Sequence, residues 1–352
     1  MLGLQRYRQP RTNEVLRLSV LDQSVATAGR GEDAAIRDTI GLAADCERLG
    51  YHRFWVSEHH SLATIVGTAP EIVMAAIAAT TSRIRIGSAG VMLPHYSALK
   101  VAEQFRVLDA IAPGRIDLGV GRAPGSDMRT ALALNPNAQH AAEDFPAQVR
   151  DLQVWVAGQT LEGITAHPRA NAAVAEEALT RTPELWILGS SDYGAQLAAH
   201  FGLPYAFAYF FADGQGAEAA LRLYRSLYKP SARHPGPQAT LCVWALVADS
   251  DEEAQHHALS RDRWRVDRMR GVFGALQAPA DVAARGFAAD ELPTLESMRR
   301  KAFVGSAERV GTMLRALAQE FALDEVVINT WAHDPAVRRR SYALLAREFE
   351  LA

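Results

Sequence analysis

The sequence predicts an α/β protein built as a (β/α)8 TIM barrel with insertions. About eight short apolar runs alternate with amphipathic stretches, which is the order of parallel strands joined by crossover helices. The 352 residues exceed the roughly 250 that such a barrel needs, so there is room for insertions. An open doubly wound sheet is the alternative. It would need a glycine-rich turn after the first strand, but the chain after Leu21 reads DQSVATAG.

The first third of the chain has the clearest pattern. Short apolar runs predict strands, and apolar residues at helical spacing predict helices. Gly50 is placed to cap the first helix, Pro70 lies near the start of the second, and Pro113 with Gly114 ends the third. The expected elements are strand 16–21, helix 33–48, strand 53–57, helix 69–81, strand 84–88, helix 98–112 and strand 116–120.

The same alternation continues less regularly toward the C-terminus, where Gly202 is placed to end one helix. The expected elements are helix 145–157, strand 185–188, helix 191–201, strand 205–209, helix 216–228, strand 240–248, helix 251–270, helix 306–321, strand 325–329 and helix 335–349. We expect residues 1–15 to form an N-terminal extension and residues 16–352 a single barrel domain. The insertions are expected at about 124–183 and 271–304.

The composition excludes several classes of protein. The chain is 49% hydrophobic with a net charge of −3, which is typical of a globular protein and gives no electrostatic reason to bind nucleic acid. Cys46 and Cys242 are too few for a disulfide framework or a cysteine-rich metal site. No apolar run reaches the roughly 18 residues that span a bilayer, and the N-terminus lacks the apolar core of a signal peptide. We expect a soluble, cytoplasmic protein with no membrane partner.

Two glycine-containing turns at predicted strand ends are candidates for binding an anion, because the active site of such a barrel lies at the C-terminal ends of its strands. Gly189, Ser190 and Ser191 lie between a strand and a helix, where free backbone N–H groups suit a phosphate. Alternatively, one of the serines only caps the helix. The local sequence by itself favours this capping role. Arg122 follows Gly121 and could either bind a phosphate or form a structural salt bridge. The sequence favours neither role over the other. Together the two turns favour phosphate.

The tripeptide Glu58-His59-His60 is the most unusual one at a strand end. Imidazoles transfer protons near neutral pH or bind metals. Adjacent histidines in an extended segment point in opposite directions, so at most one should face the barrel mouth. Later strand ends offer only His95 and Asn329 as further ligands, so a metal site ranks below proton transfer or flavin contact. A structural role for His60 remains open.

Two further features concern the shape of a site. Ala89 and Gly90 are small residues at a strand end, which would let a flat ligand approach the backbone; the alternative is that they only provide packing space. Most tryptophans lie in or beside predicted strands and should pack in the core. Trp331 and Tyr209 are the better candidates to line a pocket.

Six segments together resemble the bacterial-luciferase-like flavin-dependent monooxygenases. The match runs in order from about residue 16 to 349, and its motifs are specific in combination. The segments are LGYHRFWVSEHH (49–60), APE (69–71), RIRIGSAGVMLPHYSALKVAE (83–103), PGRIDLGVGRAPG (113–125), WILGSS (186–191) and VGSAERVG (304–311).

The resemblance implies a barrel that uses reduced FMN and O2 to oxygenate a small organic substrate, with the reduced flavin supplied by a separate NAD(P)H:flavin reductase. It implies that His59 is the catalytic proton donor or base near the flavin, and it gives no metal site. Members of the family are commonly dimers, so a homodimer is expected, with helices 33–48 and 69–81 as candidates for the interface.

The resemblance also implies a cofactor site. Its residues are Glu58, Ala89, Gly90, Gly121, Arg122, Gly189, Ser190 and Ser191. The Ala89–Gly90 peptide bond should be cis against the isoalloxazine ring, and Arg122 with the Gly-Ser-Ser turn should hold the phosphate. Gly121 stands where luciferase has a reactive cysteine, so light emission is not expected.

Three other functions remain open. The same barrel could transfer hydride with the deazaflavin F420, without O2. It could bind flavin without catalysis. It could also be a metallohydrolase that uses Glu58, His59 and His95.

Overall fold

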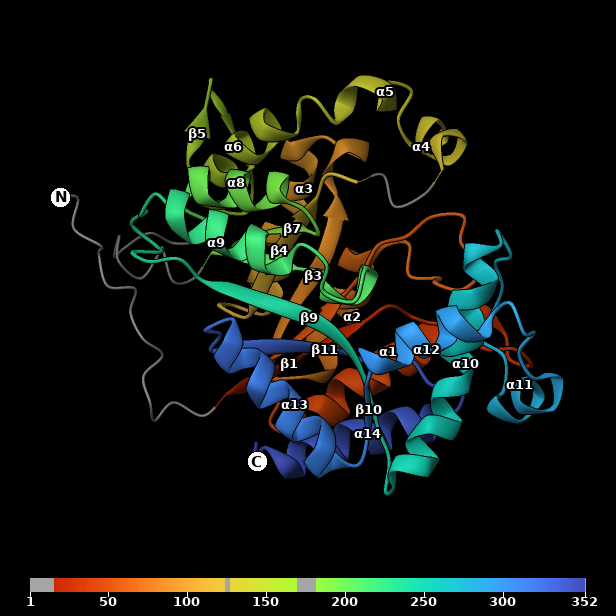
Figure 1. The fold of residues 1–352 in the computed structure, drawn as a ribbon. Coiled ribbons are helices and arrows are strands. Elements are labelled where there is room, and N and C mark those ends of the chain that lie inside the picture. Colours follow the sequence, from red (N-terminus) through yellow and green to blue (C-terminus); the bar gives the residue numbers. More distant parts are fainter. Residues whose placement is uncertain (1–15, 124–126, 170–181, 352) are drawn as a thin grey trace.

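A computed structural model describes residues 16–123, 127–169 and 182–351. The predicted N-terminal extension, residues 1–15, lies outside the described residues, as do parts of the first predicted insertion. Parallel strands occupy the centre of the molecule and helices surround them (Figure 1).

Eight parallel strands close into a barrel, which confirms the predicted fold class. They are β1 (Arg17–Asp22), β2 (Arg53–Val56), β3 (Arg85–Met92), β4 (Ile116–Gly121), β7 (Glu184–Gly189), β8 (Tyr205–Phe207), β9 (Ala239–Val247) and β11 (Glu325–Asn329). Neighbours in this order are hydrogen-bonded, and β11 pairs with β1 to complete the ring. The C-terminal ends of all eight strands therefore meet at one mouth.

The helices predicted from periodicity form within one or two residues of the expected bounds. They are α1 (Glu32–Arg48), α2 (Pro70–Thr80), α3 (Ala98–Ile111), α6 (Phe145–Val156), α8 (Asp192–Phe201), α9 (Ala217–Leu227), α10 (Asp251–Met269), α13 (Ala307–Glu320) and α14 (Pro335–Glu348). Gly50 and Gly202 adopt positive φ angles of 83° and 62° after α1 and α8, as expected of helix-ending glycines. None of the described helices is long and apolar enough to cross a lipid bilayer.

Both insertions contain elements that periodicity did not reveal. The first holds the short helices α4 (Met128–Leu134) and α5 (Ala138–Ala141), and a hairpin of β5 (Thr160–Leu161) and β6 (Ile164–Thr165). The second holds α11 (Pro279–Arg285) and α12 (Leu292–Arg300), which lie beside α10 in Figure 1. It leads into β10 (Phe303–Gly305), which pairs with the end of β9.

One strand is shorter than expected. The sequence predicts strand 205–209, but β8 ends at Phe207, and Tyr209 begins a 3₁₀ turn that runs to Phe211. Tyr209 was also predicted to line a pocket. Its ring instead packs against Phe303 and Phe321, with centroids 6.3 and 6.5 Å apart, so its role is structural.

A buried arginine closes the N-terminal end of the barrel. Nη1 of Arg53 lies 2.9 Å from both Asp117 Oδ2 and Glu184 Oε2, and its Nε lies 3.0 Å from Glu325 Oε1. Burial by itself would raise the pKa of Asp117 and Glu184, but Arg53 and Arg85 outweigh it and lower both pKa values. One guanidinium thus joins β2, β4, β7 and β11.

Replacing this arginine should destabilise the barrel. In Arg53→Met, the buried carboxylates of Asp117, Glu184 and Glu325 lose their shared cation. We expect the free energy of unfolding to fall by about 3–5 kcal/mol in a urea titration followed by circular dichroism. Arg222→Met, at an exposed pair with Glu218 on α9, is the control and should change it by less than about 1 kcal/mol. Equal effects of the two substitutions would contradict the prediction.

Candidate active site

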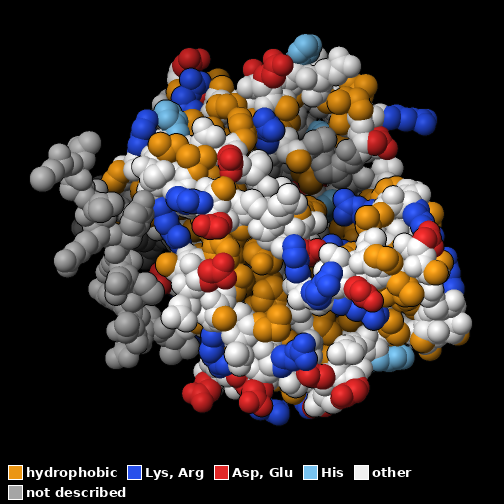
Figure 2. Space-filling view, in the orientation of Figure 1, with side chains coloured by type: hydrophobic (Ala, Val, Ile, Leu, Met, Phe, Trp, Pro, Cys, Tyr) orange, Lys and Arg blue, Asp and Glu red, His pale blue; other side chains and the backbone are white. Residues whose placement is uncertain are grey.

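A cavity of about 1060 Å³ opens at the C-terminal mouth of the barrel. Its lining comes from the ends of several strands and from α10, as the barrel rule predicts. Figure 2 shows arginine and apolar side chains side by side on the face that carries α10 and α12. The lining residues are Gln23, His59, His60, Ser61, Leu62, Ala63, Ile65, Ala123, Asp127, Phe210, Phe211, Trp244, Arg261, Trp264, Arg265, Arg268, Met269, Phe273, Asn329 and Trp331.

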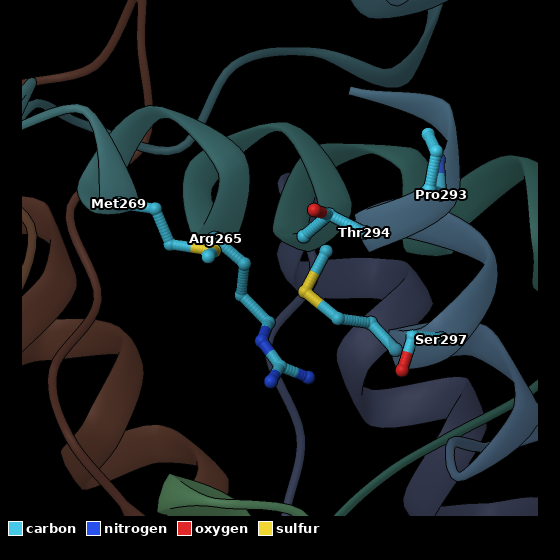
Figure 3. A pocket seen from close by; sticks show the side chains of 6 residues that line it. Arg265, Met269, Pro293, Thr294 and Ser297 are labelled. Atoms are coloured by element: carbon cyan, nitrogen blue, oxygen red, sulfur yellow. The ribbon is translucent and has the colours of Figure 1, made fainter. Parts of the chain in front are cut away.

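A smaller groove of about 380 Å³ adjoins this cavity. Figure 3 shows Arg265 and Met269 of α10 on one side of the groove and Thr294 and Ser297 of α12 on the other. Arg265 and Met269 also line the main cavity, so the groove and the cavity are neighbours at this part of α10.

Glu58 holds the segment after β2 in place. Its buried carboxylate accepts hydrogen bonds from His60 Nε2 and from the Tyr96 hydroxyl, both at 2.7 Å, and from the Met92 N–H at 3.0 Å. His60 is therefore fixed by an internal partner, which agrees with the structural alternative considered for it. Contact between Glu58 and a cofactor remains a prediction.

His59 lies on the cavity wall. Its Nδ1 lies 3.3 Å from the Ser57 hydroxyl, and its backbone N–H donates to the Gly67 carbonyl at 2.9 Å. Burial lowers the pKa of His59 to about 4, with smaller contributions from His60 and Arg268. The imidazole is therefore neutral at physiological pH.

The Ala89–Gly90 peptide bond is cis, as the resemblance implies. Strand 84–88 was expected to end before these residues, but β3 runs to Met92, so Ala89 and Gly90 lie within it, where its pairing with β4 shifts register between Ala89 and Val91. A Cβ on Gly90 would come within 2.3 Å of Leu188 Cδ1 and 2.7 Å of the Gly119 carbonyl oxygen. Close packing therefore requires glycine here, and both residues of the bond remain partly accessible.

The two predicted anion-binding turns lie next to each other. The Arg122 guanidinium stacks on the ring of Tyr193, in the first turn of α8, at 4.0 Å. Within the described residues no carboxylate pairs with Arg122, so the salt-bridge alternative is not seen there. Ser191 is the N-cap of α8, but its side chain caps no backbone N–H. Ser190 and Ser191 are both exposed, beside Gly189.

Of the predicted catalytic and cofactor residues, His59 lines the cavity, while the turns after β4 and β7 lie outside its lining. Ala123, directly after Arg122, connects them to its edge. Within the described ranges, no three His, Cys, Asp or Glu residues are grouped so that they could hold a metal ion. The set proposed for a metallohydrolase, Glu58, His59 and His95, is therefore not assembled as a metal site.

Helix α10 contributes cavity residues that were not predicted from the sequence. Arg261, Arg265 and Arg268 follow one another at intervals of four and three residues, which places them on one helix face. All three line the cavity, together with Trp264. Trp331 lines it as predicted. The arginine spacing was a readable signal, but nothing in the sequence showed that this face turns toward the barrel mouth.

The comparisons with known proteins identify the family. The model of the luciferase-like monooxygenases matches residues 16–325. The chain belongs to the luciferase-like monooxygenase family, and it is an oxidoreductase. A luciferase-like monooxygenase of Escherichia coli K12 is 36% identical over 333 residues, covering 95% of this chain and 97% of the relative.

Two further relatives match along almost their whole lengths. The N-acetyl-S-alkylcysteine monooxygenase of Bacillus subtilis 168 is 34% identical over 339 residues, covering 94% of this chain and 98% of the relative. The crystal structure of apo-MsnO8 superposes with a TM-score of 0.88 at 34% identity, covering 96% and 99% of the two chains.

More distant structures share the fold alone. They include the oxygenating component of 3,6-diketocamphane monooxygenase from Pseudomonas putida in complex with FMN (TM-score 0.67, 17% identity, 95% and 97% coverage). They also include an F420-dependent secondary alcohol dehydrogenase (TM-score 0.61, 15% identity, 95% and 99% coverage).

Gly90 and Gly121 form a matched pair for testing the packing at this mouth. Gly90→Ala should lower the free energy of unfolding by about 1–3 kcal/mol, because the new methyl group collides with β4 and Leu188. Gly121→Ala should change it little, because nothing lies within 4 Å of its Cβ position. Urea titrations measure both. If Gly90→Ala left the free energy of unfolding unchanged, the contact of residue 90 with Leu188 and the Gly119 carbonyl would not be as close as described.

The buried His59 should make stability depend on pH. The unfolded chain protonates it below about pH 6.5, whereas the folded protein keeps it neutral down to about pH 4. The unfolded state thus binds more protons between these values, and the stability present above pH 6.5 is lost as the pH falls toward 4.

His59→Asn should therefore flatten the decline in unfolding free energy between pH 6.5 and 4.5. His140→Asn, at an exposed position on α5, should not. Urea titrations across this range provide the measurement. Parallel curves for wild type and His59→Asn would contradict the lowered pKa.

Proposed function

We propose that this luciferase-like oxidoreductase is an FMN-dependent monooxygenase, which uses reduced FMN and O2 to oxygenate a small organic substrate. The observation that carries the proposal is the pairing of an exposed arginine with an uncapped helix start at neighbouring strand ends. Arg122 lies over Tyr193, two residues after Ser191 at the N-terminus of α8. A guanidinium and free helix N–H groups together suit a phosphate dianion.

The other end of the cofactor fits the partly accessible Ala89–Gly90 peptide. Ala89, Leu188 and Phe210 pack on the same buried cluster inside the barrel, and Phe210 also lines the cavity. This arrangement offers a flat apolar ring a wall between the phosphate turn and the open cavity. Gly121, with no atom within 4 Å of its Cβ position, leaves room beside Arg122.

When bound, reduced FMN would supply electrons to O2, so that one oxygen atom enters the substrate and the other leaves as water. The protein's own part is to position and to shield. His59 is neutral, and a hydrogen bond from the Ser57 hydroxyl to Nδ1 would place its proton on Nε2, where it can be donated to a ligand. Trp264 and Trp331, which pack against each other, would give the cavity an apolar wall that shields the reaction from water.

The remaining parts of the proposal concern partners. A separate NAD(P)H:flavin reductase would deliver the reduced flavin, and the protein would act in the cytoplasm as a homodimer. On α2, one of the two helices expected at the interface, the side chain of Ile72 is 68% exposed. The relative named for N-acetyl-S-alkylcysteine supports a small organic substrate.

Anaerobic titration with reduced FMN and with reduced F420 tests the cofactor assignment. We expect reduced FMN to bind more tightly, and O2 to be consumed with oxygenation of a substrate once a reductase and NAD(P)H are present. Tighter binding of F420 would indicate hydride transfer instead. Flavin binding without any turnover would indicate a flavin-binding protein.

Arg122→Gln tests the phosphate turn. It should weaken binding of FMN roughly 10- to 100-fold, because charge-assisted hydrogen bonds are lost, and leave riboflavin, which lacks the phosphate, unchanged. Arg222→Gln on the exposed face of α9 is the control and should affect neither. Fluorescence titration gives both affinities. Equal losses for FMN and riboflavin would place the phosphate elsewhere.

A further inference from the structure

Two largely buried side chains on the cavity wall, Arg261 and Trp244, have hydrogen-bond donors with no acceptor among the described residues. Arg261 is 7% exposed and makes no hydrogen bond or ion pair with the described residues; its guanidinium lies 3.9 Å from the ring centroid of Trp244. Trp244 is 4% exposed, and its Nε1 also has no partner. Buried donors are normally paired, so two adjacent unpaired ones point to a ligand that accepts hydrogen bonds.

The carboxylates near Arg261 form ion pairs with other arginines. Asp213 accepts two hydrogen bonds from Arg265 in a bidentate pair, at 2.8 and 2.9 Å. Asp262 accepts one from Arg299 at 2.7 Å. Burial and the neighbouring Arg265 lower the pKa of Arg261 to about 9, so it still carries its charge at neutral pH. The charge of Arg261 is therefore not neutralised by a protein carboxylate in contact with it.

The other two tryptophans of the cavity differ from Trp244. The indole N–H of Trp264 donates to Thr64 Oγ1 at 2.8 Å, and that of Trp331 donates to Gln23 Oε1 at 3.1 Å. Their rings, with centroids 4.7 Å apart, therefore offer only apolar surface to the space between the walls. The cavity thus combines the Arg261 and Trp244 donors with apolar indole surface, and its lining also holds Arg265, which is paired with Asp213, and the more exposed Arg268.

We propose that Arg261 and the indole N–H of Trp244 bind the carboxylate of the organic substrate, which is an acid with an apolar body. This inference rests on the proposed monooxygenase function and names its substrate class. The site lies at β9 and α10, whereas the proposed phosphate site lies at β4 and α8. Two separate anion sites allow cofactor and substrate to bind together.

Hexanoate and its neutral analogue hexanamide are suitable probes, because they differ at the end group that the site should recognise. The flavin-free protein is titrated with each by calorimetry and by tryptophan fluorescence, and the share of the fluorescence change that comes from Trp244 is given by comparison with Trp244→Phe. Wild type should bind hexanoate roughly 10- to 100-fold more tightly than hexanamide, as expected for charge-assisted hydrogen bonds.

Arg261→Gln should abolish this preference, whereas the exposed Arg222→Gln should retain it. Trp244→Phe keeps an aromatic ring under the guanidinium and removes only the N–H, so it should reduce the preference without abolishing it. It also provides a test if Arg261→Gln fails to fold. Equal binding of the two probes by wild type, or an unchanged preference in both variants, would overturn the proposal.

A second titration distinguishes the two anionic groups that could bind to Arg261, which are the carboxylate of the substrate and the phosphate of FMN. Binding of FMN and of riboflavin is measured in Arg261→Gln. If the site is for the substrate, both affinities stay at the wild-type value; a loss for FMN alone would assign Arg261 to the phosphate and overturn the proposal. The hexanoate titration contains no flavin, so a failure of wild type to bind FMN would count against the proposed function and not against this site.

Discussion

The barrel depends on one buried cation at its N-terminal end. Arg53 contacts Asp117, Glu184 and Glu325, which belong to three other strands. Burying a charge costs several kcal/mol unless a partner of opposite charge offsets it, and here the arrangement of the strands brings three carboxylates to one guanidinium. It therefore fixes which strand ends meet inside the barrel, and it seals that end against water.

The interior of the barrel changes from ion pairs at the N-terminal end, through packed apolar side chains, to an open cavity at the C-terminal mouth. Above the ion cluster, Trp55 and Trp186 meet edge to face at 5.2 Å, and their indole N–H groups donate to Asp117 and Glu184. These rings, with Leu21 and other apolar side chains, fill the middle of the barrel. Among the described residues, the large cavity along the barrel axis therefore lies at the mouth, where polar groups and longer loops replace the packed layer.

Two buried arginines, Arg53 and Arg261, differ in whether the protein supplies them with a carboxylate partner. Arg53 is buried and paired with three carboxylates, whereas Arg261 is buried and paired with none. The first arrangement is complete without a ligand. The second has no acceptor among the residues that the structure describes, so a bound ligand would supply one, and the carboxylate of the substrate is proposed to bind there.

The sequence by itself determined the alternation of strands and helices, and therefore the barrel, because apolar periodicity and helix-ending glycines such as Gly50 and Gly202 act locally. The strand-end motifs around His59 and Arg122 could be read for the same reason. Only the tertiary structure decided that Tyr209 packs inward, that Glu58 is occupied by His60 and Tyr96, and that α10 turns Arg261 toward Trp244. These facts depend on contacts between residues far apart in the chain, which no local pattern encodes.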